Sequence, residues 1–136
     1  MPSPQYTRGN VHGLDSFKTV SIEDVIMEVR ALPSKQCVSD PLPTWLLKEA
    51  ITILAPHITT IFKSSITEGH FLWTWRHAIV TPLLKRAGLD ESSPSSYRPV
   101  SNLPFLLKVL ERIVNRQLIG YVNEFHLFPD AQSAYR

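Results

Sequence analysis

The sequence is poor in residues that define several protein classes. Its 136 residues include one cysteine, Cys37, which excludes an internal disulfide framework and favours a reducing compartment. The five glycines are scattered and form no phosphate-binding loop. The uncharged stretch over 51–62 contains a proline, a histidine and three threonines, so it predicts no membrane span. Residues 1–10 lack the apolar core of a secretory leader. We therefore expect a soluble intracellular chain without membrane contact, in the nucleus or the cytoplasm.

Charge is scarce overall but unevenly placed. The net charge is +2, from 14 basic and 12 acidic residues, which is too balanced to indicate a nucleic-acid-binding protein by itself. Residues 76–116 carry 7 basic and 3 acidic side chains, a net charge of +4, whereas residues 1–75 (6 against 7) and 117–136 (1 against 2) each carry −1. A surface that faces phosphates is therefore expected in the middle third of the chain.

Apolar residues that recur every three or four positions predict four helices. The first covers 22–32, with Ser21 as N-cap, Asp24 completing a capping box and Pro33 as the stop. The other three are expected from a cap at Thr44 to Leu54, from Pro56 in a first turn to Gly69, and over 103–125.

Two short segments read instead as strands. Residues 77–84 are rich in β-branched residues, residues 97–101 read as a short second strand that also contains a proline, and a polar loop over 85–96 separates the two. Pro82 restricts the first strand to a sheet edge or a strand end. The predicted fold class is α+β and mostly helical, with the helices packed with a small antiparallel hairpin that has a long mobile tip.

The sequence contains no recognisable catalytic constellation. The histidines show no ligand spacing, and a lone loop cysteine such as Cys37 is more often inert than catalytic. The five aspartates fall in a lead-in, at a helix start and in loops, unlike the convergent carboxylates of two-metal phosphoryl transfer. We therefore predict no catalytic residue and no metal ligand.

Basic residues of the middle third suggest phosphate binding. Lys85 closes one predicted strand and Arg98 opens the next, so an ammonium and a guanidinium could reach one phosphate; solvated surface charges are the alternative. Arg86 is a further candidate for contact with a nucleic-acid backbone. On the last helix, Lys108, Arg112 and Arg116 share one face, which either follows such a backbone or is solvated and partly paired with Glu111. The tryptophans, which either stack bases or belong to the core, are Trp45, Trp73 and Trp75.

Several ordered motifs carry a resemblance to a known family. They are Trp75-Arg-His-Ala-Ile-Val-Thr-Pro-Leu-Leu-Lys85, Ser96-Tyr-Arg-Pro-Val-Ser-Asn-Leu-Pro-Phe105 and Leu106-Leu-Lys-Val-Leu-Glu-Arg-Ile-Val114. In this order the sequence resembles the reverse transcriptases of non-LTR (LINE-type) retrotransposons. Segments 17–21 and 34–48 upstream and 132–136 downstream extend the resemblance to roughly residues 17–136. Leu72, where the family commonly has proline, is a departure that we expect to be harmless.

The resemblance implies the fingers part of a right-hand polymerase fold. It divides the chain into a flexible lead-in (1–16), a fingers segment (17–126) and an incomplete start of the palm (127–136). Arg98 matches the arginine that holds the triphosphate of the incoming nucleotide, and Lys85 matches the neighbouring basic residue. The residues that match the lining of the template and nucleotide site are Gln132, Tyr135 and Arg136.

The resemblance also implies a parent reaction. A complete relative adds deoxynucleotides to a DNA primer on an RNA template and uses Mg²⁺ or Mn²⁺. The family's catalytic aspartates follow the position of Arg136, so we expect a fragment that binds no cofactor and is inactive alone, and whether the chain is an enzyme stays open. The apolar stripe of the last helix consists of Leu107, Leu110, Val114, Leu118, Tyr121 and Phe125. Val109 and Ile113 lie off this stripe, which predicts a further covering layer, a palm domain or a second copy. The alternative function is a non-enzymatic helical module that docks a partner.

Overall fold

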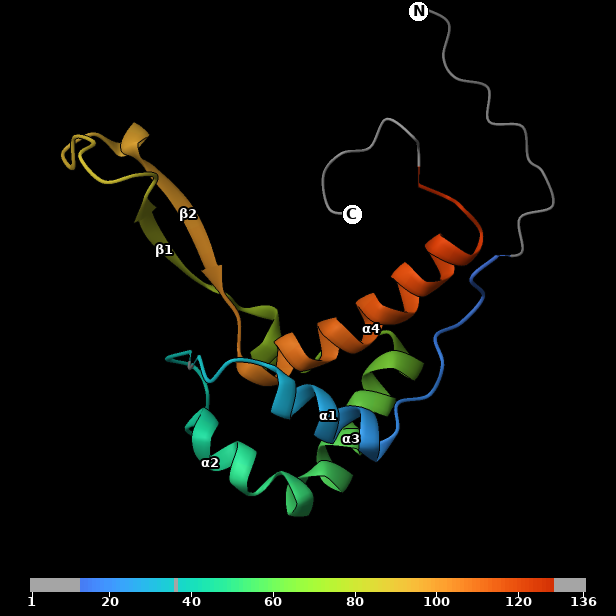
Figure 1. Cartoon of the computed structure of the whole chain (residues 1–136). Coiled ribbons are helices and arrows are strands. Elements are labelled where there is room, and N and C mark those ends of the chain that lie inside the picture. Colours follow the sequence, from blue (N-terminus) through green and yellow to red (C-terminus); the bar gives the residue numbers. More distant parts are fainter. Residues whose placement is uncertain (1–12, 36, 129–136) are drawn as a thin grey trace, which may run out of the picture.

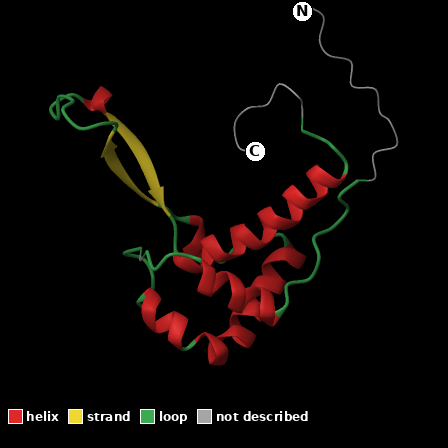
Figure 2. Ribbon diagram, viewed as in Figure 1, coloured by secondary structure: helices red, strands yellow, loops and turns green. Residues whose placement is uncertain are grey.

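The computed structural model describes residues 13–35 and 37–128. Helices gather into one body, and a β-hairpin projects from it (Figure 1). The described chain is mostly helical with a two-stranded antiparallel sheet, which confirms the α+β prediction at this level (Figure 2). The elements are α1 (Ile22–Ala31), α2 (Thr44–Glu49), α3 (Ile51–Glu68), β1 (Ile79–Leu84), β2 (Tyr97–Asn102) and α4 (Phe105–Glu124), with short 3₁₀ turns η1 (Trp73–Arg76) and η2 (Pro94–Ser96).

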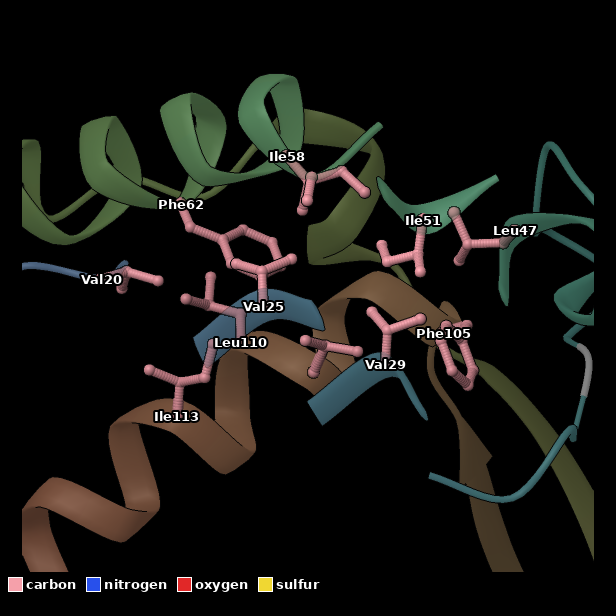
Figure 3. Close-up of a cluster of buried hydrophobic side chains, with 12 residues drawn as sticks. Val20, Val25, Val29, Leu47, Ile51, Ile58, Phe62, Phe105, Leu110 and Ile113 are labelled. Atoms are coloured by element: carbon pink, nitrogen blue, oxygen red, sulfur yellow. The ribbon is translucent and has the colours of Figure 1, made fainter. Parts of the chain in front are cut away.

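The core lies between α1, α3 and α4 (Figure 3). Val25 and Val29 of α1 pack in one cluster with Phe62 of α3 and with Leu110 and Ile113 of α4. Burying one such side chain stabilises the fold by about 1.5–3 kcal/mol. The remaining buried members are Val20, Leu47, Ile51, Ala55, Ile58, Phe105 and Val109.

The expected covering layer over Val109 and Ile113 is not needed, and that prediction was wrong. Both side chains are buried in the cluster that α1 and α3 complete. The exposed apolar positions of α4 lie instead near its C-terminal end, at Leu118 and Phe125, which the predicted stripe had placed inside. The reason is that α1 and α3 pack against the first half of α4, so the stripe is buried for only part of its length.

The start of α1 confirms the capping box. The Ser21 Oγ accepts a hydrogen bond from the Asp24 N–H at 3.1 Å, and Asp24 Oδ2 accepts the Ser21 N–H at 3.0 Å. These two bonds satisfy donors that the first turn of a helix leaves free. The helix ends where Leu32, the residue before Pro33, adopts extended backbone angles.

The boundary between α2 and α3 differs from the prediction. Thr44 does not cap α2: it is the first helical residue, Pro43 occupies the N-cap position, and the buried Thr44 hydroxyl has no hydrogen-bond partner among the described residues. α3 starts at Ile51, so Pro56 lies inside the helix rather than in its first turn. The Pro56 nitrogen carries no hydrogen, so the carbonyl of Thr52, four residues before, receives no helical hydrogen bond from it. Thr52 is exposed. Gly69 ends α3 with a φ of 65°, as predicted.

The register of the hairpin explains how two strands tolerate proline. Pro82 lies opposite Pro99, and the Lys85 N–H donates to the Ser96 carbonyl at 2.9 Å. Hydrogen-bonded and non-hydrogen-bonded pairs alternate along an antiparallel ladder, so the proline pair, three steps from that bond, is a non-hydrogen-bonded one. The N–H groups that proline lacks would point away from the partner strand at these positions, so no interstrand hydrogen bond is lost.

An aspartate fixes the base of the hairpin to the helical body. Asp40 Oδ1 accepts the N–H of Phe105, the first residue of α4, at 2.7 Å, and its Oδ2 accepts the Cys37 N–H at 2.6 Å. The N-cap residue of α4, Pro104, supplies no side-chain acceptor. Asp40 therefore caps α4 from 65 residues away, and its negative charge suits the helix N-terminus.

We expect Asp40→Ala to lower the free energy of unfolding by about 1–3 kcal/mol, because it leaves a partly buried N–H without an acceptor. Urea denaturation followed by circular dichroism measures this loss. Asp15→Ala, at an exposed position before α1, is the matched control. A midpoint for Asp40→Ala equal to that of the control would contradict the capping role.

Candidate nucleic-acid interface

The hairpin brings Lys85 and Arg98 to one face. Leu83 pairs with Arg98, and Lys85 lies two residues beyond Leu83, so pleat alternation places both cations on the same side as diagonal neighbours. Both are exposed, and the Lys85 ammonium donates to the Ser95 carbonyl at 2.8 Å. A guanidinium and an ammonium on one open face can contact the oxygens of one phosphate group.

The tip loop is held by bonds among its own residues. Asp90 accepts hydrogen bonds from the Ser92 hydroxyl at 2.7 Å and the Ser92 N–H at 2.9 Å, which lower the pKa of the Asp90 carboxyl. The Tyr97 hydroxyl donates to the Glu91 carbonyl at 3.0 Å. Against the three cations Lys85, Arg86 and Arg98, the loop sets two acids, so the tip carries a net charge of about +1 (3 − 2).

A hollow of about 550 Å³ opens beside these strands. Tyr97 and Pro99 line it from β2, and Val80 and Pro82 line it from β1, so by pleat alternation it lies mainly on the face opposite to that of Lys85 and Arg98, although Arg98 also contributes to its lining. Its lining is mainly apolar, and the cation Arg98 is balanced there by the acid Glu91. The other lining residues are Glu91, Ser92 and Pro94.

Two of the three cations of α4 form ion pairs with a buried carboxylate. Arg112 Nε donates to Glu28 Oε2 at 2.8 Å, and the Arg116 guanidinium contacts Glu28 Oε1. Glu28 belongs to α1 and is 1% exposed, whereas the two arginine side chains are 52% and 50% exposed. The carboxylate that they contact is therefore a buried one across the helix interface, rather than the neighbouring Glu111.

This ionic cluster connects α1 to α4. A buried carboxylate is costly unless cations and hydrogen bonds satisfy it, and Glu28 receives both arginines. The pairing offsets one of the two positive charges and holds both guanidinium groups against α1. The first role of Arg112 and Arg116 is therefore structural, and Lys108 remains as the half-buried cation of this face.

Asp24 lies near the same cluster. Its hydrogen bonds from the backbone and side chain of Ser21, with a smaller contribution from the charge of Arg116, hold the pKa of the Asp24 carboxyl below its usual value near 3.8. The carboxylate thus stays ionised where the first turn of α1 offers free N–H donors.

The tryptophans divide between the two alternatives. Trp75 packs edge to face against Phe62 with ring centroids 5.9 Å apart, so it belongs to the core. Trp45 on α2 and Trp73 in η1 are 59% and 70% exposed. The predicted lining residues Gln132, Tyr135 and Arg136 lie outside the described residues.

Two carboxylates with structural roles were not predicted from the sequence. Glu28 had a readable signal, because it follows Val25 by three positions and precedes Val29 on the apolar face of α1, where a charge requires a buried partner. Asp40 had none, since its acceptor role depends on contact with a residue 65 positions later.

The described residues offer no ligand set for a divalent metal ion. No three His, Cys, Asp or Glu side chains gather within this part of the chain. Asp24, Asp40 and Asp90 each accept backbone N–H groups instead. The residues present therefore do not fit the Mg²⁺ of a polymerase reaction. Among the same residues, no helix has the length and apolar character to cross a membrane.

The geometry defines a small α+β module whose helical body carries a cation-bearing arm. Comparison with known proteins shows what it resembles. The chain is 27% identical over 121 residues to the "Probable RNA-directed DNA polymerase from transposon BS" of Drosophila melanogaster, covering 88% of this chain and 13% of the relative. It is 29% identical over 120 residues to the "Probable RNA-directed DNA polymerase from transposon X-element" of the same organism, with the same shares of 88% and 13%.

A third relative is shorter in overlap but higher in identity. The "Putative 115 kDa protein in type-1 retrotransposable element R1DM" of Drosophila melanogaster is 43% identical over 61 residues, which are 44% of this chain and 6% of the relative. No family model matches the chain. No solved structure matches it significantly.

The chain is thus related to the RNA-directed DNA polymerases of retrotransposons, and the resemblance to LINE-type reverse transcriptases is confirmed. It spans about 13% of the length of the curated relatives that it matches across most of its residues, so it corresponds to a segment of them.

We expect Arg112→Ala combined with Arg116→Ala to lower the free energy of unfolding by about 3 kcal/mol or more, because Glu28 is left buried without a cation. Glu28→Gln should cost less, since it leaves two half-exposed guanidinium groups that water can solvate. Urea unfolding measures both, and Lys108→Ala on the same helix is the control. Equal losses for the double variant and Glu28→Gln would contradict this asymmetry.

The lowered pKa of Asp24 predicts a pH-dependent contribution to stability. Its stabilising effect should be fully present above the unfolded pKa and should disappear as the pH falls through the folded value. The wild-type advantage over Asp24→Asn in thermal melts should therefore shrink from about pH 7 to about pH 2. Most of it should persist in about 1 M salt, because hydrogen bonds from Ser21 are the main cause. An advantage independent of pH would refute this origin.

Proposed function

We propose that this chain acts as the fingers part of a retrotransposon reverse transcriptase and contributes contacts to nucleotide phosphates and to the template. The observation that carries the proposal is the shared face of Lys85 and Arg98 on an arm that projects from the helical body. The relatives cover 88% of the chain, so the matched stretch must include this arm. RNA-directed DNA polymerases handle polyanionic substrates, which this face suits.

Each cation has a proposed role that follows from its geometry. The planar guanidinium of Arg98 binds two phosphate oxygens of the incoming deoxynucleotide, and the Lys85 ammonium supplies a point charge beside it. Arg86, which follows Lys85 at the tip, contacts the nucleic-acid backbone. Arg112 and Arg116 add only secondary contacts through the parts of their guanidinium groups that Glu28 leaves free, with Lys108 beside them.

The proposal also covers the segments of the chain and its partners. Residues 17–126 form the fingers segment and 127–136 the start of the palm, where Gln132, Tyr135 and Arg136 line the template and nucleotide site. The partners are an RNA template, a DNA primer, deoxynucleotides and the rest of the polymerase. The complete enzyme supplies divalent-cation chemistry through Mg²⁺ or Mn²⁺, and the residues described here contribute binding and orientation only.

A second candidate function is a non-enzymatic module that docks a protein. The observation in its favour is the exposed apolar surface of Ile79, Val80 and Leu83 on β1, of Leu118 on α4 and of its C-cap residue Phe125. Analytical ultracentrifugation of the chain alone distinguishes the two: a module that works by self-docking forms concentration-dependent oligomers, and phosphate contacts by the arm do not require them.

We expect the chain to bind a labelled RNA–DNA hybrid weakly and with strong salt dependence, which fluorescence anisotropy measures. Each phosphate contact contributes a slope of about −0.7 to −0.9 in a plot of log affinity against log salt, so the three arm cations predict about −2 to −3. The double variant Lys85→Ala/Arg98→Ala should make this slope shallower by about 2. A lysine in place of Arg98 should restore part of the lost salt dependence.

Lys63→Ala, an exposed cation of α3 away from the arm, is the matched control and should leave the slope unchanged. Binding that is indifferent to salt, or that survives loss of Lys85 and Arg98, would overturn the proposal.

A further inference from the structure

An aromatic ring stands exposed at the base of the arm. Trp73 begins the 3₁₀ turn η1, between α3 and β1, and is 70% exposed, although Trp75 two residues later packs against Phe62 in the core. Exposing so large an apolar ring forfeits the stabilisation that burial would provide, so the fold gains nothing from its position. An exposed ring two residues from a partly buried one that packs on the core indicates a surface for contact.

The Trp73 ring is held in place before any ligand arrives. The His77 ring lies edge to face against it, with centroids 4.9 Å apart and planes at 69°. His77 Nδ1 lies 3.2 Å from the Trp73 carbonyl oxygen, and the Trp75 N–H donates to the Leu72 carbonyl at 2.9 Å, which closes the turn. A ring that is already oriented loses little conformational entropy on binding.

The charge around this ring favours a polyanion. Residues 69–89 contain no acidic side chain and three cations, Arg76, Lys85 and Arg86. Arg76 lies in the same turn as Trp73, and the six residues of β1 span about 20 Å from this turn toward Lys85. The exposed Trp45 of α2 lies between two acids, Asp40 and Glu49, with one cation, Lys48, three positions after it, whereas Trp73 has one acid, Glu68, five positions before it.

We propose that Trp73 stacks on a base of a single-stranded nucleic acid whose phosphates are held by Arg76 and by the cations of the arm. Aromatic rings that alternate with cations are the usual means of binding single strands without sequence preference, because every base has a face that can stack. The proposal rests on the proposed function, since it gives the phosphate-binding arm a contact to the bases.

A comparison of two strands separates base contacts from phosphate contacts. One is a labelled single-stranded RNA of about 12 nucleotides, and the other is an abasic strand with the same number of phosphates. By fluorescence anisotropy, the 136-residue chain should bind the RNA about tenfold more tightly than the abasic strand. Trp73→Leu should remove this preference without changing affinity for the abasic strand, and Trp73→Tyr should restore most of it.

Trp45→Leu is the matched control, because it removes another exposed tryptophan from a helix outside the arm. A second readout does not depend on the Leu variant: in Trp45→Phe, added RNA should quench tryptophan emission, and the abasic strand should not. Circular dichroism melts check that each variant folds.

The remaining outcomes overturn the stacking role in distinguishable ways. Equal, salt-dependent binding of both strands by the wild type leaves the phosphate contacts standing and removes the stacking. Loss of the preference in Trp45→Leu instead of Trp73→Leu assigns the base contact to α2. Binding of neither strand overturns this inference and the proposed function together. If the wild type self-associates and Trp73→Leu abolishes this with RNA binding intact, Trp73 is a protein contact.

Discussion

The placement of α4 depends on one buried carboxylate. Apolar contacts between α1, α3 and α4 supply most of the stability of the body, but such contacts are non-directional and tolerate sliding. Glu28 restricts sliding, because an uncompensated charge at 1% exposure is strongly unfavourable and only one register of α4 offers it both Arg112 and Arg116. The Gln117 side chain adds two bonds to the Lys18 backbone, at 2.6 and 3.1 Å, and fixes the segment before α1 along the same helix. Because β2 leads directly into α4, this register also decides where the arm leaves the body.

The same interaction divides the cations of the middle third into two groups. Cations spaced four residues apart lie on one face of a helix. That spacing is expected for a surface that follows phosphates, and it is equally expected for two arginines that converge on one buried acid. The structure decides for the second arrangement at Arg112 and Arg116. The arm cations lie on strands that no helix covers, so their positive charge meets solvent. Phosphate binding is therefore better supported on the arm than on α4. This holds although the net positive charge of the middle third comes from the arm and α4 together.

What could be predicted from the sequence was what local chemistry determines. The capping box at Ser21 and Asp24, the stop at Gly69 and the antiparallel pairing of the two proline-bearing segments each depend on residues close in the chain, and the structure confirms them. The failures at Thr44, on α4 and at Asp40 involve long-range packing. Thr44 has a side chain that suits an N-cap, and a cap there would start α2 at residue 45. In the folded chain α2 starts at Thr44 itself, and packing buries the Thr44 hydroxyl. The side of α4 that is buried depends on where α1 and α3 lie, which periodicity within α4 cannot specify. Asp40 shows the limit most clearly, because its two bonds join loops that only the finished fold brings together.

The arm combines exposed apolar side chains with protection against strand pairing. A two-stranded sheet has two open edges, and apolar residues such as Ile79, Val80 and Leu83 would normally favour addition of a further strand. Pro82 and Pro99 occupy opposed, non-hydrogen-bonded positions, so each removes a donor that would otherwise point outward from the middle of its edge. Their rings also obstruct a neighbouring strand. The prolines thus make the edges less suited to pairing while the faces stay open, which favours a ligand that lies across a face. A nucleic-acid strand that contacts Lys85 and Arg98 from one side and reaches Trp73 at the base meets this condition, whereas a partner that adds a β-strand does not.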